Sequence, residues 1–318
     1  MMGNSLKSIR DYLRITYEPK GMVPDGYQVS IVFQDRDQRV DGPSAGTAMA
    51  LMLDSLFTGE NLDEEFACTG GITPNGKVTS IGGVAAKIRG ATRRECRIVG
   101  VPEGNAKGVN DILVLDGVQQ LLDIQVFTMK DMDEARALSR EEKDKDVQST
   151  LDDFKTVAEV IADQGDAALK NARVKERLEA VLEAMPNHIS AKLLLDHIQG
   201  DAPERLSVGG SFHEIDSRSS AVFSRVQRTM MRGKFSEADE AESAAADARK
   251  ELEELDGKIH EKFEDYLKAA IDICKTVEED ASGGGKDLVE NLKSRWSRIN
   301  SIRKKLRDDP EVFEELRG

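Results

Sequence analysis

The sequence feature that most constrains the fold is a helix-length segment, residues 45–57, whose apolar side chains point in almost every direction around a helix axis. The segment stops at Thr58-Gly59, a helix-ending signal. Its apolar positions are Ala45, Ala48, Met49, Leu51, Met52, Leu53, Leu56 and Phe57. Because such a helix has little polar surface to present to water, we predict that it is buried between other layers of structure.

A serine stands at the start of this helix, in Asp41-Gly42-Pro43-Ser44-Ala45-Gly46. Pro43 suits a first helical turn, because its missing N–H would have no partner there. Gly46 lacks a side chain, so another backbone can approach closely. Free N–H groups and the helix dipole favour negative charge at this point. Ser44 could therefore be a nucleophile whose oxyanion is held by N–H groups, an ordinary N-cap, or part of a phosphate-binding turn.

Proton acceptors for a nucleophilic Ser44 are scarce in this part of the chain. The four histidines lie at positions 188, 197, 213 and 260, so the first 187 residues contain none. A desolvated lysine is the recognised amine alternative, since burial favours the neutral amine and lowers its pKa. Lys87 lies in the apolar helix start at residues 84–88, whereas Lys77 lies in a Pro-Asn-Gly turn and is expected to be solvated. Lys87 is therefore the candidate base.

Four segments, taken together, resemble the proteolytic domain of Lon proteases: DGPSAG at 41–46, TGGIT at 69–73, GKVTSIGGVAAK at 76–87 and VPEGN at 101–105. Their order and spacing agree over roughly residues 3–140. The resemblance implies Ser44 as the nucleophile and Lys87 as the general base. It implies Thr69 as a hydroxyl that is hydrogen-bonded to the lysine, and Asp41 as a carboxylate near the serine. A mixed α/β fold and assembly into rings, commonly hexamers, are also implied.

The chain departs from the family pattern in three respects. Gly71 stands where the family usually has an acidic residue, which removes an expected carboxylate beside Thr69 and Lys87. The strands that normally open the domain are not seen before the first predicted helix, at residues 5–15; either they lie upstream of this sequence or the domain is trimmed. The family's ATPase motor is not seen, and the glycines at 283–285 do not form a phosphate loop.

Alternating short strand and helix signals predict an α/β (α+β) layer domain over residues 1–140. We expect strands at 27–33, 65–69, 77–81, 97–101 and 125–127, and helices at 5–15, 45–57, 87–93 and 118–122. The composition changes near residues 140–150. Residues 1–140 hold 16 Lys and Arg against 19 Asp and Glu, whereas residues 141–318 hold 29 against 40.

Residues 141–318 are predicted to form an all-α region. A segment near 174–199 weakly resembles a tetratricopeptide-type repeat, and His188 beside Pro186 in it is expected to be a cap or turn residue rather than a ligand. Apolar residues three or four apart at 252–277 and at 288–306, separated by Gly283–Gly285, predict a helical hairpin near 235–307. We expect its apolar stripe to serve internal packing, with an interaction arm as the alternative.

Cofactors and partners are constrained by charge and by the cysteines. The net charge of −14 argues against nucleic acid as the principal partner, because phosphate binding needs clustered cations. Cys68, Cys96 and Cys274 have no metal-ligand spacing, which indicates a reducing compartment and no metal site. We expect no cofactor. No apolar run approaches the roughly 18 residues of a membrane span. We expect a cytoplasmic protein.

These observations predict a serine peptidase with a Ser-Lys dyad that cleaves unfolded or flexible polypeptides. We expect it to work without an ATPase of its own and as a homo-oligomer. Two other functions stay open. An inactive Lon-like scaffold or adaptor is motivated by Gly71 and by the short start of the domain. A phosphate-ligand-binding domain of related fold would use the same helix start.

Overall fold

The computed structural model describes residues 2–23, 43–283 and 286–317. Contacts divide the chain into two compact units, Met1–Ala202 and Pro203–Arg317. Among the described residues, every strand belongs to the first unit. The strand expected at 27–33 lies outside the described residues.

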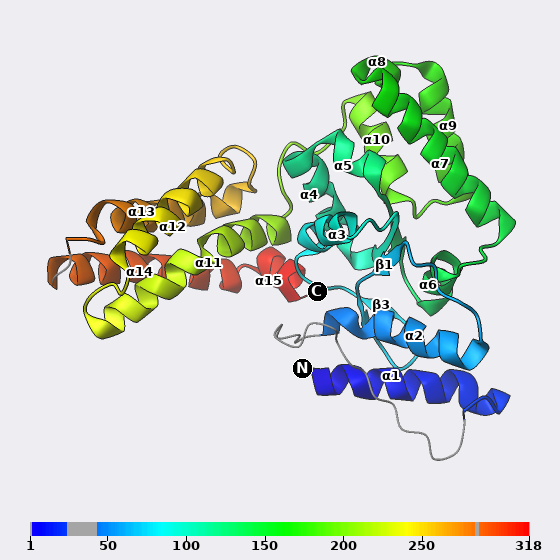
Figure 1. Cartoon of the computed structure of the whole chain (residues 1–318), viewed down its shortest axis with the longest axis horizontal. Coiled ribbons are helices and arrows are strands. Elements are labelled where there is room, and N and C mark those ends of the chain that lie inside the picture. The colour runs from blue at the N-terminus through cyan, green and yellow to red at the C-terminus, as the bar shows by residue number, and fades with distance from the viewer. Residues whose placement is uncertain (1, 24–42, 284–285, 318) are drawn as a thin grey trace. The chain divides into compact units, whose positions relative to one another are not determined.

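The first unit is organised around a parallel three-stranded sheet (Figure 1). Its strands, in spatial order, are β1 (Phe66–Cys68), β4 (Ile98–Pro102) and β5 (Gln125–Met129). All five residues of β4 are buried, as expected of a central parallel strand with both faces covered. Side chains alternate along the strands, so Ile98 and Phe127 enter one core and Val99 and Val126 enter another.

One core lies against helices α1 (Met2–Tyr17), α2 (Gly46–Thr58) and α6 (Met132–Ser139). Helices α1 and α2 lie side by side in Figure 1. The predicted helix after Ser44 is confirmed, but its burial on every side is wrong: Met52 is 55% exposed and Leu56 is 78% exposed. The two lie one turn apart, on one exposed side of α2.

The other core is formed with seven helices: α3 (Val84–Arg93), α4 (Ala106–Asp116), α5 (Val118–Asp123), α7 (Lys145–Gln164), α8 (Asp166–Leu169), α9 (Ala172–Ala184) and α10 (Ile189–Gln199). Helix α7 packs on α5, and α10 packs on both α5 and β5. The compact unit therefore continues past the change of composition near residue 140, because the next helices cover the sheet.

The link between α9 and α10 and the start of α10 are attached to strand β5. In the link, Asn187 Nδ2 donates to Thr128 O and Asn187 O accepts from Thr128 N, both at 2.9 Å. Ser190 Oγ donates to Ile124 O and accepts from Val126 N, both at 2.9 Å. His188 caps α10 by accepting from Ala191 N, so the expectation that it is a cap residue is confirmed. The ring lies between those of Phe127 and Phe154, tilted against both, and its burial lowers the pKa of His188 to about 3. His188 is therefore neutral and structural.

The second unit is helical throughout its described residues. Its main helices are α11 (Val208–Arg232), α12 (Ala238–Glu253), α13 (Glu264–Asp280), α14 (Lys286–Asp308) and α15 (Pro310–Arg317). Helix α13 packs against both α12 and α14. The apolar stripe predicted at 252–277 is not one continuous helix, because α12 ends at Glu253 and the chain turns at Gly257, whose φ is +74°. Leu255, Ile259 and Phe263 are nevertheless buried in the turns between α12 and α13.

No helix in the described parts of the chain combines the length and the apolar character that crossing a bilayer requires.

Candidate active site

Ser44 is the central residue of a short 3₁₀ turn, Pro43–Ala45, that leads directly into α2. The residue is half-buried. Its carbonyl oxygen accepts two hydrogen bonds, from the Gly70 N–H at 2.9 Å and from Thr69 Oγ1 at 3.1 Å. These bonds attach the serine turn to the link between β1 and β2 (Gly71–Ile72).

The start of α2 approaches this link so closely that glycine is needed on both sides. Thr47 N donates to Gly70 O at 2.9 Å, and Thr47 Oγ1 donates to Gly71 O at 3.2 Å. A Cβ on Gly46 would lie 3.2 Å from Ile72 N, as the expected close backbone approach requires. Gly70 has φ +153°, and a Cβ there would lie 2.8 Å from a Val78 methyl carbon.

Gly71 lies against a side chain of the strand that pairs with it. Strand β2 is antiparallel to β3 (Val78–Thr79), with Gly71 opposite Thr79. A Cβ added to Gly71 would lie 2.3 Å from Thr79 Oγ1, which is far inside contact distance. An acidic residue at position 71 is therefore incompatible with this placement of Thr79. No carboxylate from position 71 supports Thr69 or Lys87.

Lys87 lies in the first turn of α3, after Gly83 in the left-handed region with φ +69°. Its Nζ donates to the carbonyl oxygen of Gly82. The residue is exposed to solvent, yet burial of the ammonium's surroundings lowers the pKa of Lys87 below that of an ordinary lysine. The lowered pKa agrees with the expectation, although the Lys87 side chain is more exposed to solvent than that of an enclosed base.

The loop that precedes Lys87 is fixed by Asn105, a residue that the sequence reasoning did not single out. Asn105 Oδ1 accepts from Ile81 N and Asn105 Nδ2 donates to Ile81 O, both at 2.8 Å. The side-chain amide thus pairs with both backbone groups of one residue. A Cβ on Gly104 would lie 2.2 Å from Ser80 Oγ, so a larger residue there would require this hydroxyl to rotate away. The only sequence signal was the position of Asn105 in the VPEGN segment, which begins in β4 and ends with the short 3₁₀ turn Glu103–Asn105.

The structure brings Ser44 and Thr69 together, through the bond from Thr69 Oγ1 to the serine carbonyl. Within the described residues, no hydrogen bond joins Lys87 Nζ to Ser44 Oγ or to Thr69, and the lysine is bonded to Gly82 instead. The hydroxyl of Thr69 keeps its acceptor lone pairs, so it remains able to accept from a lysine. Asp41 lies outside the described residues. The Ser44–Lys87 dyad and the roles of Thr69 and Asp41 stay predictions.

Other candidates for chemistry in the first unit are weak. Burial raises the pKa of Cys68 to about 12, so this thiol beside Thr69 is protonated at neutral pH and is not an activated nucleophile. Desolvation also raises the pKa of Cys96. Across residues 2–23, 43–283 and 286–317, no group of three or more His, Cys, Asp or Glu side chains is arranged to hold a metal ion.

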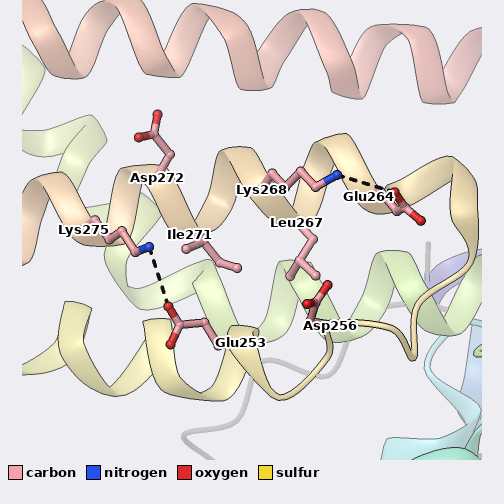
Figure 2. Close-up of a pocket in the computed structure, with 8 residues that line it drawn as sticks. All are labelled: Glu253, Asp256, Glu264, Leu267, Lys268, Ile271, Asp272 and Lys275. Atoms are coloured by element: carbon pink, nitrogen blue, oxygen red, sulfur yellow. Dashed lines mark hydrogen bonds and ion pairs between the residues drawn. The ribbon is translucent and has the colours of Figure 1, made fainter.

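A hollow of about 380 Å³ opens between the end of α12 and helix α13 in the second unit (Figure 2). Its two lysines are paired inside it, Lys268 with Glu264 at 3.5 Å and Lys275 with Glu253 at 3.8 Å. The residues that line it are Glu253, Asp256, Glu264, Leu267, Lys268, Ile271, Asp272 and Lys275. None of these is a serine, threonine, cysteine or histidine, so this hollow does not compete with Ser44 as a site for nucleophilic catalysis.

Comparison with known proteins places the relationship in the first unit. Residues 1–138 match the family of the Lon protease (S16) C-terminal proteolytic domain. Lon protease 1 of Herpetosiphon aurantiacus is 36% identical over 115 residues, which is 35% of this chain and 14% of that protein. Lon protease of Rhizobium meliloti is 35% identical over 127 residues (39% and 16%), and Lon protease 2 of Desulfotalea psychrophila is 30% identical over 148 residues (46% and 19%).

These matches confirm the resemblance that the four segments predicted. The chain spans less than a fifth of the length of each of these curated relatives, and the similarity lies in their proteolytic domain. The second unit lies beyond the matched residues.

Proposed function

We propose that this chain is a Lon-like serine peptidase that hydrolyses peptide bonds in unfolded or flexible polypeptides, with Ser44 as nucleophile and Lys87 as general base. One structural observation carries the proposal: the described parts of the four family segments are hydrogen-bonded to one another in series. The serine turn is bonded to Thr69-Gly70, β2 pairs with β3, and Asn105 holds Ile81. The serine and lysine segments are therefore joined by one network of hydrogen bonds within the first unit.

In the proposed mechanism, neutral Lys87 accepts the proton of Ser44 Oγ as this oxygen attacks the substrate carbonyl. The Thr47 N–H is already used by Gly70 O, so the preceding N–H groups, including that of Ser44, hold the oxyanion. Such a donor is worth about 2.7–4 kcal/mol in measured cases. The lysine then protonates the leaving amine, and water, deprotonated by the same lysine, hydrolyses the acyl-enzyme.

The reaction requires the lysine to exchange one partner for another. Lys87 Nζ must leave the Gly82 carbonyl and approach Ser44 Oγ and Thr69 Oγ1. The Lys87 side chain is exposed and has a flexible four-carbon stem, so its ammonium can change hydrogen-bond partners. A bound polypeptide would exclude water from the ammonium, which lowers the lysine pKa further.

We also propose that cleavage needs no nucleotide bound to this chain, since no Walker motif occurs in these 318 residues. Homo-oligomeric assembly is proposed on the resemblance to Lon proteolytic domains.

The decisive experiment measures degradation of an unfolded protein such as casein, with and without ATP, by the full chain. Ser44→Ala and Lys87→Ala are expected to lower the rate by at least about a thousandfold. Lys77→Ala is the matched control, because Lys77 is an exposed lysine in the turn between β2 and β3. Turnover that survives in Ser44→Ala would overturn the proposal.

An inactive scaffold is the second candidate, and two observations favour it. The Lys87 ammonium is bonded to Gly82 O, and Gly71 supplies no carboxylate. A folded wild-type chain that cleaves no unfolded substrate between pH 7 and pH 10 would support this function. Degradation that is lost with Ser44→Ala would exclude it.

A further inference from the structure

Helix α14 carries a concentration of positive charge that the net charge of the chain conceals. Residues 293–307 contain seven Lys and Arg and no Asp or Glu, in a protein of net charge −14. The cations are Lys293, Arg295, Arg298, Arg303, Lys304, Lys305 and Arg307. In contrast, residues 237–282, which include α12 and α13, hold 16 acidic and six basic residues.

Two of the seven cations are used inside the helical unit. Arg295 pairs with Asp272 at 3.1 Å, and Arg303 pairs with Asp216. The other five are exposed, and none of them has an ion-pair partner among the described residues. We call these five the α14 cationic face: Lys293, Arg298, Lys304, Lys305 and Arg307.

The residues between these cations indicate the chemistry of the partner. The other exposed positions from 293 to 307 are Ser294, Ser297, Asn300 and Ser301, so hydroxyl and amide groups alternate with the charges. A membrane-binding helix needs an exposed apolar face, and the core of a protein–protein interface is depleted in lysine. Cationic, hydroxyl and amide groups are those that contact phosphate oxygens in nucleic acids.

The arrangement suits a duplex better than a single strand. The indole of Trp296 packs edge-on against Phe223, with ring centroids 5.2 Å apart, so this aromatic ring does not offer a free platform for base stacking. From position 293 to 307 the helix extends about 21 Å. That length of duplex carries roughly twelve phosphate charges, counting both strands.

We propose that the α14 cationic face binds the phosphate backbone of double-stranded nucleic acid without reading its sequence. This departs from the expectation based on net charge. Charges separated by more than about 8 Å in solution are largely screened at physiological salt, so the local cluster governs contact with a phosphate backbone. The acidic surface of α12 and α13 keeps other faces of this unit away from the duplex.

Binding of the full chain to a fluorescent 30-base-pair DNA is measured by anisotropy between 50 and 200 mM NaCl. Five phosphate contacts predict a slope of about −4.5 in log K against log salt concentration, or roughly 500-fold weaker binding over this range. The double variant Lys304→Glu/Lys305→Glu should weaken binding at least tenfold and reduce the slope by about 2.

The matched control is Lys170→Glu/Arg173→Glu, which changes the net charge equally at exposed residues of the first unit. It should alter binding less than twofold. Because reversed charges near the end of α14 could unfold it, Lys293→Gln/Arg298→Gln is tested in parallel, with circular dichroism as the check. Absent binding at 50 mM salt, equal losses in variant and control, or tighter binding to single-stranded DNA or to vesicles with 30% phosphatidylserine would each overturn the proposal.

Discussion

The two ends of helix α2 are held in place by different kinds of interaction. At the N-terminal end, glycines allow backbone groups of the serine turn and of residues 69–71 to meet directly. At the C-terminal end, Asp54 is buried and accepts hydrogen bonds from Tyr17, Arg136 and Arg140. Backbone contacts constrain the position of the candidate nucleophile without using its hydroxyl, whereas the charged cluster joins α1, α2 and the end of α6.

The helix therefore has a buried charged cluster at one end and the candidate nucleophile at the other. Burial raises the pKa of the Asp54 carboxyl, and the guanidinium groups of Arg136 and Arg140 oppose that shift. Removal of one partner from such a cluster leaves uncompensated charges, which costs more than the intact cluster contributes. Among the described residues, in contrast, the bonds that hold the serine turn are made by the Ser44 carbonyl oxygen and not by its hydroxyl.

The largest effect on stability is expected for Asp54→Ala. The substitution leaves Arg136 and Arg140 without their shared buried carboxylate, so unfolding free energy should fall by about 3–5 kcal/mol. Thermal or urea unfolding measures the loss. The control is Glu60→Ala, because Glu60 also pairs with Arg140 but is exposed. A loss that is no larger for Asp54→Ala than for Glu60→Ala would show that the cluster does not hold this end.

At the other end, Gly46→Val should cost about 1–3 kcal/mol through overpacking. The added carbons would press on the backbone of Gly70 and Ile72, which cannot move without displacing the serine turn. Activity on casein should therefore fall further than stability alone explains. The control is Gly90→Ala, because a Cβ on this glycine of α3 would have no close neighbour. Gly59→Ala is unsuitable, because Gly59 has φ +74° and any side chain there would strain the backbone. Equal activity in Gly46→Val and Gly90→Ala would contradict this interpretation.

Asn105→Ala tests how the lysine segment is positioned. The change leaves the Ile81 N–H and carbonyl without their side-chain partners, at a cost of about 1–3 kcal/mol. We expect kcat to fall about tenfold, with KM nearly unchanged, because the loop before Lys87 loses its anchor. Asn105→Asp retains the acceptor but not the donor and should recover part of the loss. A change in KM alone would indicate a role in substrate binding.

A dependence on pH follows from the lowered pKa of Lys87. Only the neutral amine can accept the serine proton, so kcat/KM should rise with pH and level off above the lysine pKa. The midpoint should lie below the 10.5 of an unperturbed lysine, because desolvation disfavours the charged form. A pH–rate profile on a short unfolded peptide checks this. A profile that decreases through the same range would exclude a lysine base.

The smallest effect is expected for Ser44→Ala on stability. The serine contributes its carbonyl oxygen to Gly70 and Thr69, and alanine retains that group. The unfolding free energy should therefore change by no more than about 0.5 kcal/mol while peptidase activity is lost. A large loss of stability would instead indicate that the hydroxyl has a structural role.

Much of the first unit could be predicted from local signals. The helix after Ser44, the helix that contains Lys87, and the strands at 66–68, 98–102 and 125–129 lie where apolar pattern and glycine placed them. The exposure of Met52 and Leu56 could not be predicted, because an all-apolar helix does not reveal which side its neighbours leave open. The turn that interrupts the apolar stripe at 252–263 could not be predicted either, because residues in a packed turn can be as apolar as those in a helix.

The sequence by itself determined the segments, their order and the match of residues 1–138 to a proteolytic domain, because each depends on residue types at short spacing. The tertiary structure decided which groups meet: Asn105 with Ile81, Thr69 with the Ser44 carbonyl, and Asn187 of the α9–α10 link with Thr128 of strand β5. It also decided that five cations of α14 have no ion-pair partner among the residues that the structure describes. Such contacts join residues that are distant along the chain, and only packing selects among the many partners that their chemistry would allow.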